Sequence, residues 1–70
     1  MKFNELDRVK VLRDFSKEDV HKGDVGVVVF AFTQPHEAYE VEFDDGFGKP
    51  KATFPIFPED LEKVFKPMIG

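Results

Sequence analysis

The stretch that decides the fold is His21–Phe32, HKGDVGVVVFAF. A charged turn containing Gly23 leads to a second glycine, Gly26, and the residues Val25–Phe32 carry no polar side chain. Four valines in five positions favour a β-strand over a helix, because β-branched side chains fit a pleated strand. An apolar run on both faces predicts a strand that is covered on both sides. Gly26 would permit a bend or bulge through which this strand joins both halves of a small sheet.

Apolar and polar side chains alternate on either side of this run, and this pattern predicts four more strands. They are expected at Asp7–Leu12, Ala38–Phe43, Lys51–Phe57 and Glu62–Phe65. The side chains predicted to point inward are Val9, Val11, Tyr39, Val41, Phe43, Ala52, Phe54, Ile56 and Val64, with one or both of Phe30 and Phe32. Pro55 cannot donate a hydrogen bond to a neighbouring strand, so its strand should lie at an edge of the sheet.

Polar segments connect the strands. Arg13–Asp24 is expected to be a loop with a single helical turn after Ser16, pinned to the core by Val20. Thr33–Glu37 and Asp44–Pro50 are predicted turns, the second with two glycines suited to positive φ. Pro58–Leu61 has the composition of one helical turn, which would bring Leu61 into the core.

Five short strands and one helical turn before the last strand predict an all-β fold, a small five-stranded, partly open barrel. The 70-residue chain contains no cysteine, so apolar side chains alone, including nine phenylalanines, must form its core. Residues 1–66 are expected to form a single domain, and residues 67–70 a frayed tail.

Composition limits the partners and the compartment. Fourteen acidic and ten basic residues give a net charge of −4, which repels phosphate and disfavours nucleic acid, whereas a cationic partner is favoured. The first residues, MKFNELDRVK, contain no apolar segment of a secretion signal. The longest apolar run is far shorter than the roughly 20 residues that span a bilayer. We therefore expect a cytoplasmic protein without a membrane segment. The oligomeric state is left open.

No group of residues predicts catalysis, a cofactor or a metal. His21 and His36 are the only histidines, and Ser16 is the only serine, with no motif around any of them. Asp44-Asp45-Gly46 resembles the start of a calcium loop, but the following residues lack its further oxygen ligands, so a hairpin turn is expected. The protein is therefore predicted not to be an enzyme.

An acidic row is the first candidate for binding. Alternation along the strand places Glu40, Glu42 and Asp44 on its outward side, and Asp45 extends the row at the turn. The row is either a docking face for a basic protein surface or a solvated strand face. In the second case, Lys49 and Lys51 would be its cross-strand partners.

Three phenylalanines fall in loops or on the outward side of a strand. Phe15, Phe47 and Phe57 either form an exposed patch beside the acidic row or fold over the barrel ends as additional core. The predicted partner-binding residues are therefore Phe15, Glu40, Glu42, Asp44, Asp45, Phe47 and Phe57.

Four segments in this order carry a family resemblance. LDRVKVLRDF (6–15), HKGDVGVVV (21–29), YEVEFDDG (39–46) and PEDLEKV (58–64) resemble the DUF4926 family, and the order of elements resembles SH3-like barrels. The resemblance implies a small bacterial domain with a Gly-Asp-x-Gly-x-Val signature. GDVGVV also resembles the turn of KOW domains, and YEVEFDDG a Tudor-type strand.

The family resemblance suggests an interaction role, because members of this kind often look like companions of toxin-like or nuclease-like proteins. We therefore expect a protein-interaction module, such as an immunity or accessory protein, that binds a basic partner. Two alternatives remain open. One is a KOW-like or Tudor-like nucleic-acid-binding module that uses Arg8, Lys10, Arg13, Lys17 and Lys22. The other is a stabilising domain of a larger complex.

Overall fold

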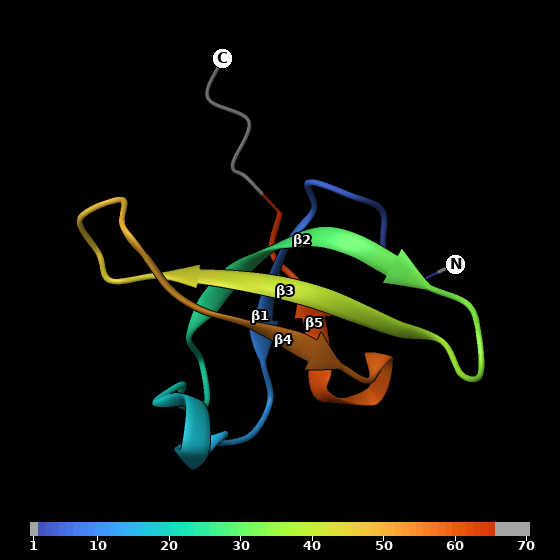
Figure 1. Ribbon diagram of the computed structural model, residues 1–70, viewed down its shortest axis with the longest axis horizontal. Coiled ribbons are helices and arrows are strands. Elements are labelled where there is room, and N and C mark those ends of the chain that lie inside the picture. Colours follow the sequence, from blue (N-terminus) through green and yellow to red (C-terminus); the bar gives the residue numbers. More distant parts are fainter. Residues whose placement is uncertain (1, 66–70) are drawn as a thin grey trace.

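A computed structural model describes residues 2–65, and its elements follow the predicted order (Figure 1). The strands are β1 (Arg8–Val11), β2 (Val25–Phe32), β3 (Ala38–Asp44), β4 (Pro50–Ile56) and β5 (Leu61–Lys63), and two 3-10 turns are η1 (Ser16–Glu18) and η2 (Pro58–Asp60). The five predicted strands and both helical turns are confirmed, with small differences at their ends. The predicted tail, residues 67–70, lies outside the described residues. Within residues 2–65 no helix has the length and apolar character needed to cross a membrane.

The five strands form one antiparallel sheet in the order β4-β3-β2-β1-β5. The sheet does not close, because no pairing joins β4 to β5 in the described chain. The beginning of β2 pairs with β1, from Arg8 opposite Val27 to Lys10 opposite Val25, while β2 pairs with β3 from Val27 onward. In Figure 1, β2, β3 and β4 cross the front of the molecule and β1 and β5 lie behind them. This arrangement confirms a partly open all-β barrel in which β2 joins the two halves.

The interior is filled by the inward side chains of all five strands, together with two residues from the connecting segments. Buried side chains are Phe3, Val9, Val11, Val20, Val28, Tyr39, Val41, Phe43, Ile56 and Leu61. Val20 pins the long loop as predicted, and Pro55 lies on β4, an edge strand, also as predicted. Phe3 was not anticipated as a core residue, because a lone apolar side chain among charged neighbours shows no period.

The prediction that β2 is covered on both sides is wrong. Its inward side chain Val28 is fully buried, but Val25, Val29 and Phe30 are 39%, 37% and 49% exposed. The physical reason is that the chain forms a single curled sheet, and no second layer lies on its outer side within residues 2–65. An apolar outer side chain on this sheet therefore faces solvent.

The irregularity in β2 also differs from the expectation. The register shifts between Val28 and Phe30, so the bulge lies at Val29 and not at Gly26. The extra residue changes which side chains point inward: Ala31 pairs with Tyr39 and packs on the core, whereas Phe30 pairs with Glu40. Phe30 and the partly buried Phe32 therefore lie on the outer side, contrary to the prediction that at least one of them is core.

Candidate protein-interaction face

The acidic row lies on the outer side of β3, as predicted. Glu42 and Asp44 are exposed and Glu40 is partly buried. The expected lysine partners are not formed, because the β3–β4 register places Pro55 opposite Glu40 and Thr53 opposite Glu42. Within residues 2–65, none of the ion pairs includes a carboxylate of this row. These carboxylates are therefore available to a cation from outside.

Apolar side chains of β2 lie directly beside this row. Val27 is opposite Glu42 and Phe30 is opposite Glu40, and cross-strand partners share one face of a sheet. We call the outer side chains of β2 the β2 stripe: Val25, Val27, Val29, Phe30 and Phe32. The rings of Phe30 and Phe32 meet edge to face at 4.8 Å between centroids. Val25, Val29 and Phe30 are exposed in this stripe, whereas Val27 and Phe32 are partly buried. Neighbouring exposed apolar side chains of this kind often mark an interface.

Basic side chains of β1 border the β2 stripe on its other side. Arg8 is opposite Val27 and Lys10 is opposite Val25. Lys10 already forms an ion pair with Glu62, at 3.1 Å between Nζ and Oε1, while the ion pairs among residues 2–65 do not include Arg8. We call this surface of β1, β2 and β3 the outer face. It is basic at β1, apolar along β2 and acidic at β3.

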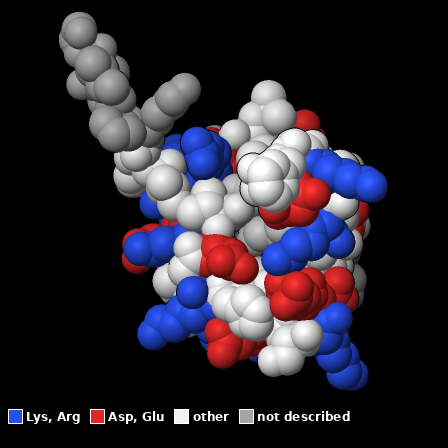
Figure 2. Space-filling model, turned by 90° about the vertical axis from the view of Figure 1, so that its left-hand side faces the viewer, with Lys and Arg blue, Asp and Glu red and all other residues white. Residues whose placement is uncertain are grey.

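Charges of both signs are close together on the side of the molecule where the β3–β4 hairpin ends. Figure 2 shows acidic side chains beside basic ones, with uncharged side chains exposed between them. The net charge of −4 therefore does not produce a uniformly acidic surface there. Any recognition on this side depends on the local pattern of charge.

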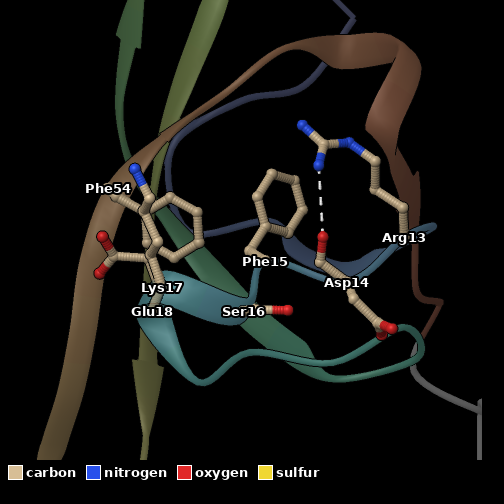
Figure 3. A pocket seen from close by; sticks show the side chains of 7 residues that line it. All are labelled: Arg13, Asp14, Phe15, Ser16, Lys17, Glu18 and Phe54. Carbon is tan, nitrogen blue, oxygen red and sulfur yellow. Dashed lines mark hydrogen bonds between the residues drawn. The ribbon is translucent and has the colours of Figure 1, made fainter.

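Phe15 lies in the loop before η1 and serves as additional core. Its ring packs against Phe54 at 5.3 Å between centroids, and Phe54 stacks on the buried Phe43. The guanidinium of Arg13 covers Phe15 at 4.0 Å from the ring centroid (Figure 3). A shallow hollow of about 340 Å³ remains beside these rings. Of the two interpretations of Phe15, the packing supports the core plug.

Asp44 and Asp45 brace the β3–β4 turn. Asp44 Oδ1 accepts a hydrogen bond from the N–H of Gly46 at 2.8 Å, and Asp45 Oδ1 accepts one from the N–H of Phe47 at 2.8 Å. The two turn glycines have positive φ, as predicted. Phe47 is 93% exposed at the tip, and among residues 2–65 its ring packs on no other ring.

Phe57 lies at the opposite end of the β3–β4 ladder from Phe47, since Ile56 pairs with Tyr39 and Pro50 pairs with Asp44. It is 49% exposed and borders an apolar hollow of about 410 Å³. The other apolar side chains that line this hollow are Phe32, Pro35, Ala38 and Pro55. Phe15, Phe47 and Phe57 therefore occupy three separate places. Phe30 is the aromatic residue directly opposite the acidic row, and Phe32, which is opposite Ala38, shares the hollow that Phe57 borders.

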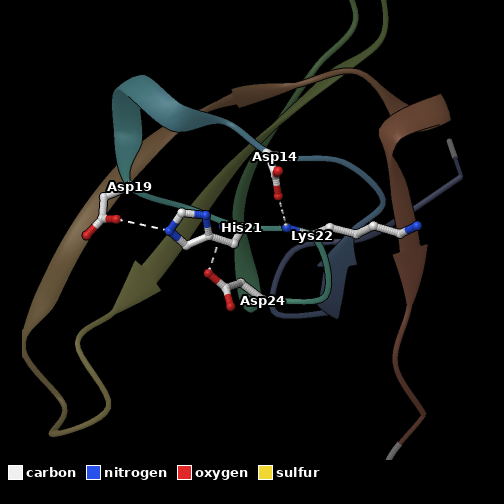
Figure 4. A network of polar contacts seen from close by, with 5 residues as sticks. All are labelled: Asp14, Asp19, His21, Lys22 and Asp24. Atoms are coloured by element: carbon white, nitrogen blue, oxygen red, sulfur yellow. Dashed lines mark hydrogen bonds and ion pairs between the residues drawn. The ribbon is translucent and has the colours of Figure 1, made fainter.

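The polar loop between β1 and β2 has a local structural role. Asp24 Oδ2 accepts a hydrogen bond from the N–H of His21 at 2.9 Å, and Asp14 Oδ1 accepts one from the N–H of Lys22 at 2.7 Å (Figure 4). The exposed imidazole of His21 contacts Asp19 at 3.1 Å. Among residues 2–65, no three histidine, cysteine or acidic side chains gather in a way that could hold a metal ion.

The sequence of this chain matches a known family model. The model described as "Domain of unknown function (DUF4926)" matches residues 5–63 of the 70. The chain belongs to the DUF4926 family. Curated proteins and solved structures show no match to it. The matched DUF4926 region contains all five strands and therefore the whole outer face.

Sequence reasoning assigned one or both of Phe30 and Phe32 to the core rather than to the surface, and it considered Arg8 only as a cation for nucleic-acid binding. An unbroken apolar run hides the period of two, so nothing in β2 itself separated its inner from its outer side chains. The chain length could have indicated that one side of β2 is exposed, because a five-stranded sheet of this size leaves no residues for a second layer on its outer side.

Proposed function

We propose that this DUF4926 protein is a non-enzymatic interaction module whose outer face binds another protein with a basic surface. The observation that carries the proposal is the direct adjacency of the exposed Phe30 and the partly buried Val27 to carboxylates that have no ion-pair partner within residues 2–65. Phe30 and Glu40 are opposite each other, as are Val27 and Glu42. Buried apolar area supplies affinity, whereas the flanking charges select the partner and speed its approach.

A toxin-like or nuclease-like protein is the partner class that we put forward. Enzymes that act on nucleic acids carry basic surfaces, and a small acidic protein can cover such a surface. This DUF4926 protein would then act as an immunity or accessory protein for that partner. The charge of the outward residues of β3 is of the matching sign.

Nucleic-acid binding is the less favoured function. Two of its five candidate cations are already paired, since Lys10 contacts Glu62 and Arg13 Nε contacts Asp60 Oδ2, each at 3.1 Å. Each neutralised phosphate needs a free cation, so the remaining charge is small. A gel-shift assay with RNA and DNA at low salt tests it, and binding there would favour this alternative over a protein partner.

The test of the proposal is a titration against the purified product of the adjacent gene, at low and high salt. We expect binding that weakens with salt, and a loss of roughly tenfold or more for a Glu40→Lys/Glu42→Lys variant. Phe30→Ala should also weaken binding. The matched controls are Glu59→Lys on η2 and Phe47→Ala at the hairpin tip, which lie outside the outer face and should bind normally. Equal binding by all variants would refute the proposed face.

A further inference from the structure

The outer face is complementary in charge to itself, and we infer that a second copy of this chain docks on it as a two-fold symmetric dimer. This dimer rests on the proposed function, because both use the outer face as a binding surface. The occupant is identified by the order of charges across β1, β2 and β3, which is basic, apolar and acidic.

The row Arg8–Val27–Glu42 defines this order. The pairing places Arg8 and Glu42 on either side of Val27, two strand spacings or roughly 10 Å apart along the sheet. They line one shallow hollow with Val25, Val27 and Asp44, yet no ion pair joins Arg8 to Glu42. Two opposite charges therefore stand on the same row, each without a partner among residues 2–65.

Symmetry determines what each charge would meet. A two-fold axis that runs parallel to β2, between two outer faces, exchanges the two sides of the face and keeps the position along the strand. Arg8 then faces Glu42 of the second copy, and Glu42 faces Arg8 of the second copy. An axis perpendicular to the strands would place Arg8 against Arg8. The charge pattern thus selects one dimer geometry.

The β2 stripe lies on that axis. Val25, Val27 and Phe30 would each meet the same residue of the second copy, so apolar side chains would pack on apolar side chains. Lys10 and Asp44 occupy the next positions on the two sides, although Lys10 must share its charge with Glu62. The contact between Arg8 of one copy and Glu42 of the other is therefore expected to determine the geometry of the dimer.

The size of the face predicts a reversible dimer. A standard interface removes about 800 Å² from each partner, which is about one sixth of the 5153 Å² exposed by one chain. Three strands about 5 Å apart, the longest of eight residues, cover roughly 15 Å by 26 Å of sheet, which is less than that. We expect association that depends on protein concentration and weakens with salt, and that must release the face before a basic partner binds.

Sedimentation velocity over a range of protein concentrations tests the inference. We expect the wild type to dimerise, and Arg8→Glu and Glu42→Arg each to be monomeric because like charges then face each other twice. An equimolar mixture of the two variants should form a heterodimer, since one chain is acidic and the other basic at both positions. Placing both substitutions in one chain should restore the homodimer. Lys17→Glu and Glu59→Arg change the net charge outside the face and should leave dimerisation unchanged.

The results that would overturn the inference are a wild type that stays monomeric at every concentration, or single variants that still dimerise. A mixture that remains monomeric would exclude this pairing geometry. Failure of the proposed function is distinguishable, because Arg8→Glu should abolish the dimer and retain binding of a basic partner. If the wild type stays monomeric but binds the partner, only the inferred dimer is refuted. If the protein dimerises but substitution of Glu40 and Glu42 leaves partner binding unchanged, only the proposed function is refuted.

Discussion

The hydroxyl of Tyr39 donates a hydrogen bond to the carboxylate of Glu37, and the same hydroxyl accepts bonds from the N–H groups of Lys2 and Phe3 at 2.9 and 3.2 Å. Tyr39 is fully buried, and its ring meets the ring of Phe3 edge to face at 5.1 Å. One phenol at the start of β3 therefore holds the segment before β1 against the core.

Tyr39→Phe removes the hydroxyl and keeps the ring. We expect a loss of about 1–3 kcal/mol in the free energy of unfolding, because the N–H of Phe3 is left buried without its acceptor. Chemical denaturation measures the loss, and hydrogen exchange should show reduced protection of the Phe3 amide. Phe47→Ala, at a 93% exposed position, is the control and should be neutral. Unchanged protection of the Phe3 amide would contradict the assigned role.

The same contact predicts a pH dependence of stability. The hydrogen bond from Tyr39, and then that from the N–H of Lys2, lower the pKa of Glu37 below its usual 4.5. The stabilisation is therefore complete above the unfolded pKa and is lost as pH falls through the lower folded pKa. Burial, and then the bond to Glu37, raise the pKa of Tyr39 above 10.0, so its contribution is complete below 10.0 and is lost at higher pH.

Glu37→Gln isolates the acid limb of this dependence. The variant should be less stable than the wild type at neutral pH, and the difference should narrow as pH falls below 4.5, because the wild type loses its carboxylate there. Denaturant unfolding at a series of pH values measures the gap. A gap that stays constant down to the lowest pH at which both fold would show that ionisation of Glu37 is irrelevant.

The strands were predictable because their signals are local. In β3 the alternation of Tyr39, Val41 and Phe43 with acidic residues specifies both the strand and its inner side, and all three are buried. The turn glycines and the 3-10 turn that begins at Pro58 are equally local, since each depends on backbone preferences of a few residues.

The outer face was predictable only in its acidic part. Which residue lies opposite Glu40 or Glu42 depends on register, and bulges at β2 and at the end of β3 shift that register by amounts no local pattern encodes. The same bulge turned Phe30 outward. Phe3 was missed because its burial depends on a contact 36 residues away along the chain.

Gly26, which the sequence suggested as the site of a bend, is required for the close approach of β2 to β3. A Cβ atom there would lie 2.6 Å from Val41 Cγ1 and 2.7 Å from the carbonyl oxygen of Glu42. The oxygen belongs to the backbone of a paired strand and cannot move without breaking the ladder. Gly26→Ala should therefore lower the free energy of unfolding by about 1–3 kcal/mol or more.

Gly46→Ala is the matched control for this substitution. Its Cβ would meet no atom within 4 Å, so its only penalty is the positive φ of +89°, of about 1–2 kcal/mol. Thermal and denaturant unfolding measure the loss of stability in both variants, which is due to a steric clash in Gly26→Ala and to an unfavourable backbone conformation in Gly46→Ala. We expect Gly26→Ala also to disturb the amide shifts of Val41 and Phe43, whereas Gly46→Ala changes only the turn. A Gly26→Ala protein with wild-type stability would show that β2 and β3 are less closely packed than the structure indicates.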